Sequence, residues 1–197
     1  MGSYNRLTIT TFVHQVLREK VHRGSVVVDA TMGNGKDTYF LYSLIGEEGW
    51  VYAFDIQEAS IINTKLLFSE AKVLLTSKIN LIHDGHENMD KYINEPIDCC
   101  VFNLGYLPGG SHNIVTKPDT ALRALEAALR LLKRGGIVTI SIYYGHEGGK
   151  EEKERILAYL EELPFEYYNV MQWNTINNKN NPPIVVIIEK KVTGKKT

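Results

Sequence analysis

The chain has 197 residues, of which 44% are hydrophobic and 23% are charged, and these values exclude a disordered chain in favour of a globular protein. Its formal net charge of -1 excludes a broadly basic coat for nucleic acid, although a local basic patch could still contact one part of a structured RNA. No apolar run approaches the roughly 20 residues that cross a bilayer, and the opening stretch MGSYNRLTITTF lacks the pattern of a secretory signal, so we expect a cytoplasmic protein without a membrane partner.

The first half of the chain alternates between helix and strand patterns. An amphipathic helix opens it, with an apolar face made of Ile9, Phe12, Val13, Val16 and Leu17. The β-branched run at 25–30 predicts a strand covered on both faces, followed by a helix at about 37–45 and a strand at 49–55. A helix at 58–73, a strand at 79–83 and a small helix near 86–93 come next. We expect the helix at 58–73 to present to the core the residues Ile61, Ile62, Lys65, Leu66 and Phe68.

The second half continues the alternation and then breaks it. A strand at 97–103 leads into a long loop at 104–117, and Pro118 signals the start of a helix. The core-facing stripe of that helix is Leu122, Leu125, Leu129 and Leu132. A strand at 135–144 and a helix at 147–163 precede two strands, 165–173 and 184–191, which a loop without a helix joins as an antiparallel pair. The sequence therefore predicts one α/β domain over 1–197, with a seven-stranded, mostly parallel, doubly wound sheet that ends in an antiparallel hairpin.

The chain's two cysteines, Cys99 and Cys100, are adjacent in a predicted strand. Neighbours on a strand point to opposite faces, and a disulfide between them would strain the backbone. We expect two buried thiols, and because no Cys/His cluster has metal-ligand spacing, we expect no metal site.

Four unusual stretches fall where predicted parallel strands end: DATMGNG, Asp55, HDGH and NLGY. Right-handed crossovers bring the carboxyl ends of such strands to one edge of the sheet, where ligands bind. We expect these stretches to form one site.

The glycine turn at Gly33 and Gly35 fits neither common phosphate-binding pattern. A P-loop requires a glycine where Ala30 stands and Ser or Thr where Asp37 stands, and a dinucleotide fold requires a third glycine where Thr38 stands. The acids Asp29 and Asp37 flank the turn; they would repel a pyrophosphate and suit the ammonium and sulfonium groups of S-adenosylmethionine. Asp55, at the end of the second strand, suits the ribose hydroxyls of that cofactor, and it would serve NAD equally well.

The turn resembles motif I of class I methyltransferases, with Thr31 in the place of the usual first glycine. The runs VDATMGNGKDT, VYAFDIQ, HDGHENM and FNLGYLPGG, in this order, resemble the bacterial tRNA 5-(aminomethyl)-2-thiouridylate methyltransferases, once labelled "putative rRNA methylases". The resemblance implies a Rossmann-like fold and an RNA-binding tRNA-modification enzyme. That enzyme would methylate the aminomethyl nitrogen of 5-aminomethyl-(2-thio)uridine at the wobble position, with the tRNA anticodon arm as its partner.

Other functions stay open at this point. The same donor site could serve rRNA or a small-molecule amine, and two further classes are a nucleotide-binding oxidoreductase and a non-catalytic donor-binding sensor. Thr38 and the flanking acids disfavour the oxidoreductase, and the NLGY stretch disfavours the sensor. A homodimer is an option that the sequence does not decide.

The resemblance also implies roles for individual residues. Asn103-Leu104-Gly105-Tyr106 resembles the Asn-Pro-Pro-Tyr motif of amino-group methyltransferases, in which the Asn oxygen and a backbone carbonyl accept hydrogen bonds from the target nitrogen. Asn103 and Tyr106 are thus the catalytic candidates, although Leu104 and Gly105 replace both prolines. The donor-site candidates are Asp29, Thr31, Gly33, Asn34, Gly35, Asp37, Thr38, Asp55, Gln57, Asp84, His86 and Asn103. The substrate-site candidates are Tyr106, Pro108, Gly109, Gly110, His112 and Tyr143. Independently of the resemblance, the candidates for phosphate contact are the basic residues Lys20, His22, Arg23, Lys117 and Lys179.

Overall fold

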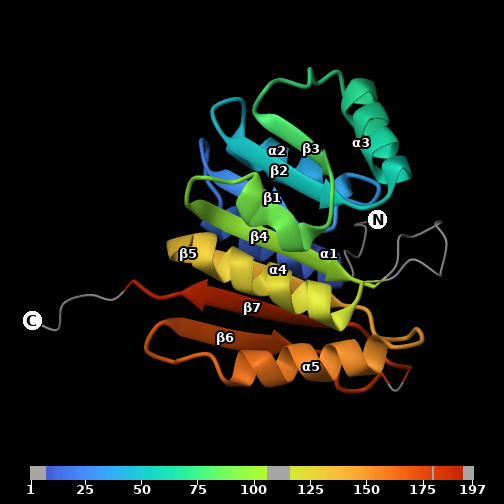
Figure 1. Cartoon of the computed structure of the whole chain (residues 1–197), viewed down its shortest axis with the longest axis vertical. Helices are drawn as coiled ribbons and strands as arrows, with labels where there is room; N and C mark the ends of the chain where they lie inside the picture. The colour runs from blue at the N-terminus through green and yellow to red at the C-terminus, as the bar shows by residue number, and fades with distance from the viewer. Residues whose placement is uncertain (1–7, 106–115, 179, 193–197) are drawn as a thin grey trace, which may run out of the picture.

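A computed structural model describes residues 8–105, 116–178 and 180–192. Over these residues seven strands form one sheet in the order β3-β2-β1-β4-β5-β7-β6 (Figure 1). Their bounds are β1 (Val26–Asp29), β2 (Trp50–Asp55), β3 (Ile79–His83), β4 (Ile97–Leu104), β5 (Leu132–Ile142), β6 (Tyr168–Trp173) and β7 (Ile184–Lys190). The first five strands pair in parallel, and β7 runs antiparallel to both β5 and β6. The predicted mostly parallel sheet with a C-terminal antiparallel pair is confirmed.

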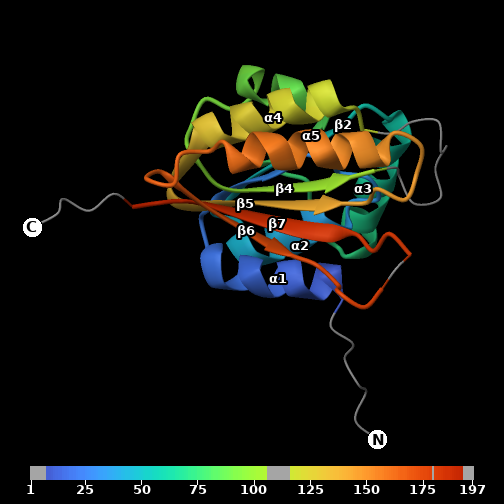
Figure 2. The same cartoon turned by 90° about the horizontal axis from the view of Figure 1, so that it is seen from below.

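Helices cover both faces of the sheet. They are α1 (Ile9–Lys20), α2 (Lys36–Ile45), α3 (Glu58–Glu70), α4 (Pro118–Leu131), α5 (Gly149–Glu161) and the short 3₁₀-helix η1 (His86–Lys91). Figure 2 shows α4 and α5 on one side of the sheet and α1 and α2 on the other. The described residues include no helix long and apolar enough to cross a bilayer.

Local signals explain several helix ends. The side chain of Thr8 accepts a hydrogen bond from the Thr11 amide, and the Thr11 hydroxyl accepts one from the Thr8 amide, so α1 begins with a capping box. Pro118 stands in the first turn of α4, where its missing N–H is not needed. Both signals are local, and the predicted helix start at Pro118 is confirmed.

The two sheet faces carry separate apolar cores. Alternate residues of β4 divide between them: Cys99 packs with α1 and α2, whereas Cys100 packs in the core under α4 and α5. Both cysteines are buried free thiols, as predicted. Over the described part of the chain, no group of three or more His, Cys, Asp or Glu side chains is close enough to hold a metal ion.

The inward face of α3 differs from the prediction. Ile62 is 51% exposed and Leu66 is 56% exposed, so the expectation that they face the core is wrong. The face that is buried consists of Ser60, Ile61, Thr64 and Phe68. Thr64 on this buried face packs against Gly35 of the glycine turn, where a larger apolar side chain would not fit.

The junction between α4 and β5 also differs. Leu132 begins β5 instead of continuing the helix stripe, and β5 starts three residues earlier than the predicted strand at 135. The ammonium group of Lys190, on β7, donates hydrogen bonds to the carbonyl oxygens of Leu129 (2.9 Å) and Leu132 (2.8 Å). A distant residue thereby satisfies carbonyls at the helix end, and the chain enters the strand without a loop.

Candidate active site at the carboxyl edge of the sheet

A cavity of about 960 Å³ lies at the carboxyl ends of the parallel strands. Its wall includes the turn after β1, the end of β2, the start of η1, Asn103 at the end of β4 and Tyr143 after β5. Strand order reverses between β1 and β4, which are neighbours in the sheet, and open α/β sheets bind ligands at such a point. Over the described residues, which end at Gly105 in the NLGY stretch, the four stretches meet at one edge of the sheet as predicted.

The turn after β1 depends on its two glycines. Gly33 has φ 52° and Gly35 has φ 76°. Residues with a Cβ adopt this left-handed backbone conformation only at a cost in free energy. A Cβ on Gly35 would also lie 2.5 Å from the Thr64 hydroxyl oxygen on α3. The glycines therefore allow the chain to enter α2 directly beneath the cavity while α3 packs against the turn.

Asp55 ties this turn to the end of β2. One carboxylate oxygen accepts a hydrogen bond from the Gly33 amide and the other accepts one from the Gln57 amide, both at 2.9 Å. Asp55 and Gln57 line the cavity. The carboxylate is therefore held in place before any ligand arrives.

Asp29 lies beneath the wall of the cavity. It is fully buried, and it accepts hydrogen bonds from the Thr38 hydroxyl (2.6 Å) and the Thr31 amide (3.2 Å). Burial, together with the negative charge of Asp37, raises the pKa of Asp29 to about 7. Neither Asp29 nor Thr38 lines the cavity, so their geometry is that of a support under the turn.

Asp37 does line the cavity, and it joins two distant segments. Its Oδ1 accepts a hydrogen bond from Nε2 of His14, and its Oδ2 accepts one from Nδ2 of Asn103, both at 2.8 Å. Burial opposes ionisation of this group, but the hydrogen bonds from His14 and Asn103 prevail and lower the pKa of Asp37 below its ordinary value. Asp37 is therefore a carboxylate at neutral pH.

Asn103 is held at two points. Its backbone N–H donates to the Thr31 hydroxyl oxygen at 2.7 Å, and its side-chain nitrogen donates to Asp37. Because a carboxylate only accepts hydrogen bonds, the amide nitrogen faces Asp37 and the amide oxygen is turned away from it. An acceptor oxygen is thus held at the end of β4.

The backbone after Asn103 departs from the proline motif it resembles. The carbonyl of Leu104 accepts a hydrogen bond from the Tyr143 amide at 2.9 Å, and that of Gly105 accepts one from the Thr116 amide at 3.0 Å. Gly105 has φ 148°, and a Cβ there would lie 3.1 Å from Cβ of Tyr143. Both carbonyls already have protein partners, so the side-chain oxygen of Asn103 is the better placed acceptor.

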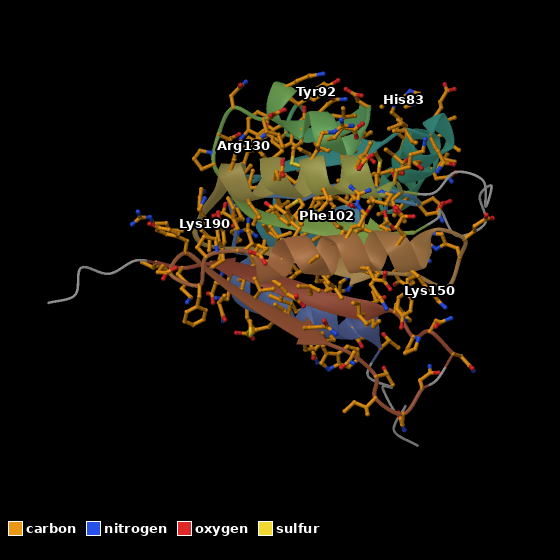
Figure 3. The ribbon with its side chains drawn as sticks, turned by 60° about the horizontal axis from the view of Figure 1, so that its bottom comes forward. His83, Tyr92, Phe102, Arg130, Lys150 and Lys190 are labelled. Carbon is orange, nitrogen blue, oxygen red and sulfur yellow. The ribbon has the colours of Figure 1, made fainter. Side chains whose placement is uncertain are left out.

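His86 lines the cavity from the start of η1. Its Nδ1 donates to the carbonyl of Ala30 at 2.9 Å, and its ring packs against that of Phe102 in a T-shaped arrangement with a centroid distance of 5.9 Å. Phe102 lies in the interior of the molecule (Figure 3). Burial lowers the pKa of His86, so the ring is neutral and Nε2 is its acceptor nitrogen.

Asp84 is engaged elsewhere. Its carboxylate accepts hydrogen bonds from the Gly85 amide (2.7 Å), the Asn88 side chain (2.9 Å) and the Tyr92 hydroxyl (2.9 Å), and it does not line the cavity. Glu87, three residues along in the same motif, lines it instead. Asp84 therefore stabilises the start of η1 through these hydrogen bonds.

The remaining candidates divide into three groups. Thr31, Gly33, Asn34 and Tyr143 line the cavity, and Tyr143 is 39% exposed. Gly35 shapes the turn without lining the wall. Tyr106, Pro108, Gly109, Gly110 and His112 lie outside the described residues.

The basic candidates for phosphate contact also separate. Lys20 pairs with Glu189 at 2.5 Å and Arg23 pairs with Glu48 at 2.9 Å, whereas Lys117 lines the cavity. His22 does not line it, and Lys179 lies outside the described residues.

Some residues of the site were missed by the sequence reasoning. Lys36 and Glu87 line the cavity and stand inside motifs that were already singled out, so their positions carried a signal. His14, by contrast, belongs to an ordinary amphipathic helix, and no local pattern sets it apart.

Comparison with known proteins bears on the chemistry of this cavity. Residues 51–189 match the model of a protein family described as "Putative rRNA methylase". The chain is 34% identical, over 195 residues, to the chloroplastic tRNA (mnm5s2U34)-methyltransferase of Arabidopsis thaliana, covering 95% of this chain and 71% of that protein.

Solved structures agree with this similarity. A "putative rRNA-methylase" from Clostridium thermocellum is 46% identical with a TM-score of 0.89, and the match covers 93% of this chain and 100% of that one. A protein from Streptococcus mutans described as "a putative methyltransferase", in complex with S-adenosylhomocysteine (SAH), is 38% identical with a TM-score of 0.85, covering 93% of this chain and 98% of that one.

Proposed function

This chain belongs to the family described as "Putative rRNA methylase", and we propose that it methylates the aminomethyl nitrogen of 5-aminomethyl-(2-thio)uridine at the wobble position of tRNA. The product is 5-methylaminomethyl-(2-thio)uridine. We infer that residues 1–197 act as one methyltransferase domain and that the anticodon arm is the partner. The proposed substrate rests on one observation: the chain is similar, over 95% of its length, to a relative that is named as a methyltransferase of tRNA position 34.

The chain is an S-adenosylmethionine-dependent methyltransferase, and the described residues fit this cofactor. Asp37, Asp55 and Glu87 line the cavity, and their carboxylates suit a ligand that carries an ammonium and a sulfonium. The fixed carboxylate of Asp55 is suited to a ribose. When bound, the cofactor supplies a methyl group on a positively charged sulfur.

The protein's own contribution is alignment of the acceptor and exclusion of water. A lysine-like amine is largely protonated at neutral pH, and it must give its proton to solvent water before the nitrogen can attack. The side-chain oxygen of Asn103 can accept a hydrogen bond from the neutral amine and so direct the lone pair of the amine nitrogen toward the methyl group. Alignment of this kind can reach effective molarities of about 10⁵ M and above. Desolvation inside the cavity favours the neutral amine.

Contacts with RNA follow from the wall of the cavity. Tyr143, which is partly exposed there, offers an aromatic surface on which a nucleobase can stack, and base stacking on aromatic side chains is worth about 1–3 kcal/mol. Lys36 and Lys117 supply positive charge at the same cavity for the phosphates. A chain with a net charge of -1 can therefore still bind RNA phosphates at this cavity through these two lysines.

The test is nucleoside mass spectrometry of tRNA that carries unmethylated aminomethyl-uridine, after incubation with the protein and S-adenosylmethionine. We expect aminomethyl-uridine to be replaced by the nucleoside that is heavier by one methylene group. Parallel incubations with rRNA and with a small-molecule amine separate the other acceptors. Methylation of either one, with tRNA unchanged, would contradict the proposed substrate and leave the methyltransferase assignment standing.

A further inference from the structure

A chain of hydrogen bonds runs from α1 to the acceptor oxygen of the site. Nε2 of His14 lies 2.8 Å from Oδ1 of Asp37, and Oδ2 of Asp37 lies 2.8 Å from Nδ2 of Asn103. The three residues come from α1, α2 and β4, which lie far apart in the sequence. His14 and Asp37 are each about one-fifth exposed, so the link is largely sheltered from water.

The ring of His14 is held in its plane by packing. It stacks on Phe40 with a centroid distance of 3.6 Å and an angle of 5°, and the guanidinium of Arg18 lies 5.0 Å from the centre of the same Phe40 ring. His14 and Arg18 are one turn apart on α1, and Asp37 and Phe40 are one turn apart on α2. Stacking therefore fixes the ring while its edge reaches the carboxylate.

The direction of each hydrogen bond follows from the carboxylate. An ionised Asp37 can only accept, so His14 donates from Nε2 and Asn103 donates from Nδ2. An amide group is nearly symmetric in shape and could turn over if nothing held it. In the turned-over state it would present two N–H donors to an amine and repel the protons that the amine carries.

We propose that His14 is a positioning residue, which fixes Asp37 so that Asp37 in turn holds the amide oxygen of Asn103 toward the methyl acceptor. The inference rests on the proposed function in taking an amine nitrogen as that acceptor. His14 does not line the cavity, so it acts through Asp37 and touches neither substrate nor cofactor.

Two substitutions separate the hydrogen bond from the stacked ring. His14→Gln keeps an N–H donor and loses the ring, whereas His14→Phe keeps a ring on Phe40 and loses the donor. For tRNA methylation we expect His14→Phe to lower kcat about tenfold to a hundredfold, with KM for tRNA and Kd for SAH changed less than about threefold. We expect His14→Gln to keep most of kcat.

Arg18→Ala is the matched control, because it removes the other contact to Phe40 and leaves the chain of hydrogen bonds intact. Its kcat should equal that of the wild type. The double variant His14→Phe/Asn103→Ala should be no slower than Asn103→Ala alone, since one residue acts through the other. Loss of kcat in His14→Gln with retention in His14→Phe, or independent effects in the double variant, would overturn the inference.

A second measurement, hydrogen exchange of the Asn103 side chain, tests the role of His14 independently of the substrate. In the wild type and in His14→Gln, the NMR signals of the Asn103 side-chain NH₂ should exchange slowly with water, and in His14→Phe exchange should be at least about tenfold faster. If the wild type leaves aminomethyl-uridine unmethylated but this exchange pattern holds, the proposed substrate fails and the positioning role stands. Equal exchange in all three proteins would overturn the positioning role.

Discussion

Asp29 and Asp37 flank the same glycine turn, yet their surroundings give them opposite properties. Asp29 is fully buried with two hydrogen-bond donors, and burial raises its pKa to about 7. Burial also acts against ionisation of Asp37, but donors from His14 and Asn103 lower its pKa. The negative charge offered to a cationic cofactor therefore comes from the wall residues Asp37, Asp55 and Glu87, with Asp29 as a support beneath.

The buried carboxyl of Asp29 predicts a pH-dependent stability. Its pKa is 3.8 when unperturbed and about 7 in the folded protein, so its contribution is complete below about pH 4 and is lost as the pH rises through 7. Relative to Asp29→Asn, the free energy of unfolding of the wild type should fall by about 1.4 kcal/mol per pH unit within that window. Urea denaturation of both proteins across and above the window measures this. A difference that does not vary with pH would show that Asp29 is ionised throughout.

Asn103 predicts a separation between turnover and cofactor binding. Asn103→Ala removes the acceptor oxygen and should lower kcat about a hundredfold or more, because alignment of the amine is lost. Affinity for SAH, measured by calorimetry, should change less than about threefold if the side chain serves the acceptor rather than the donor.

Asn80→Ala is the control for the loss of an asparagine, since Asn80 lies on β3 and does not line the cavity. An Asn103→Ala protein that loses SAH binding in proportion to its turnover would reassign Asn103 to the donor site.

The turn between β1 and α2 shows how one element restricts another. Gly35 needs its left-handed backbone to begin α2, and Thr64 of α3 packs where a Cβ would stand. A small side chain at Thr64 on the buried face of α3 follows from this contact. An isolated hydrophobic pattern for 58–73 contains no information about a neighbour that lies about thirty positions earlier in the chain.

Gly35→Ala should lower the free energy of unfolding by about 2–4 kcal/mol, from backbone strain and overpacking together. Combining it with Thr64→Ala should recover part of the loss, because the two closest atoms, at 2.5 and 2.8 Å, are removed while the strained φ remains. Urea denaturation of the single and double variants provides the measurement. Full additivity of the two substitutions would mean that the steric contact is unimportant.

On the scale of the whole molecule, the cavity lies where the strand order reverses, between β1 and β4. A ligand that binds in this cavity stabilises the folded protein. A ligand at a hundred times its Kd adds about 2.7 kcal/mol to stability. For a chain of this length that raises Tm by roughly 5–10 °C. We expect SAH to produce this shift in a thermal melt and NAD to leave Tm unchanged, since the carboxylates of Asp37, Asp55 and Glu87 line the cavity and would repel a pyrophosphate. Stabilisation by NAD alone would contradict the assignment.

Much of the fold could be predicted because its signals are local. The apolar periodicity of α1, the β-branched run of β1 and the proline of α4 depend on residues close together in the sequence, and the order of helices and strands could be predicted from such patterns. The glycine turn with its acids indicated a cationic adenosine ligand, since charge sign depends on residue type alone. The convergence of DATMGNG, Asp55 and NLGY at one edge followed from the handedness of parallel crossovers.

Contacts between distant segments decided the rest. The place of β7 between β5 and β6, the hydrogen bonds of Lys190 to the end of α4, and the burial of Ile61 beside an exposed Ile62 arise only when elements pack. His14 reaches Asp37 across 23 positions, and Asp37 reaches Asn103 across 66. Residue type and spacing determine which chemical groups the chain carries. Burial and hydrogen-bond partners set the charge of a carboxylate and the orientation of an amide, and they exist only once the chain has folded.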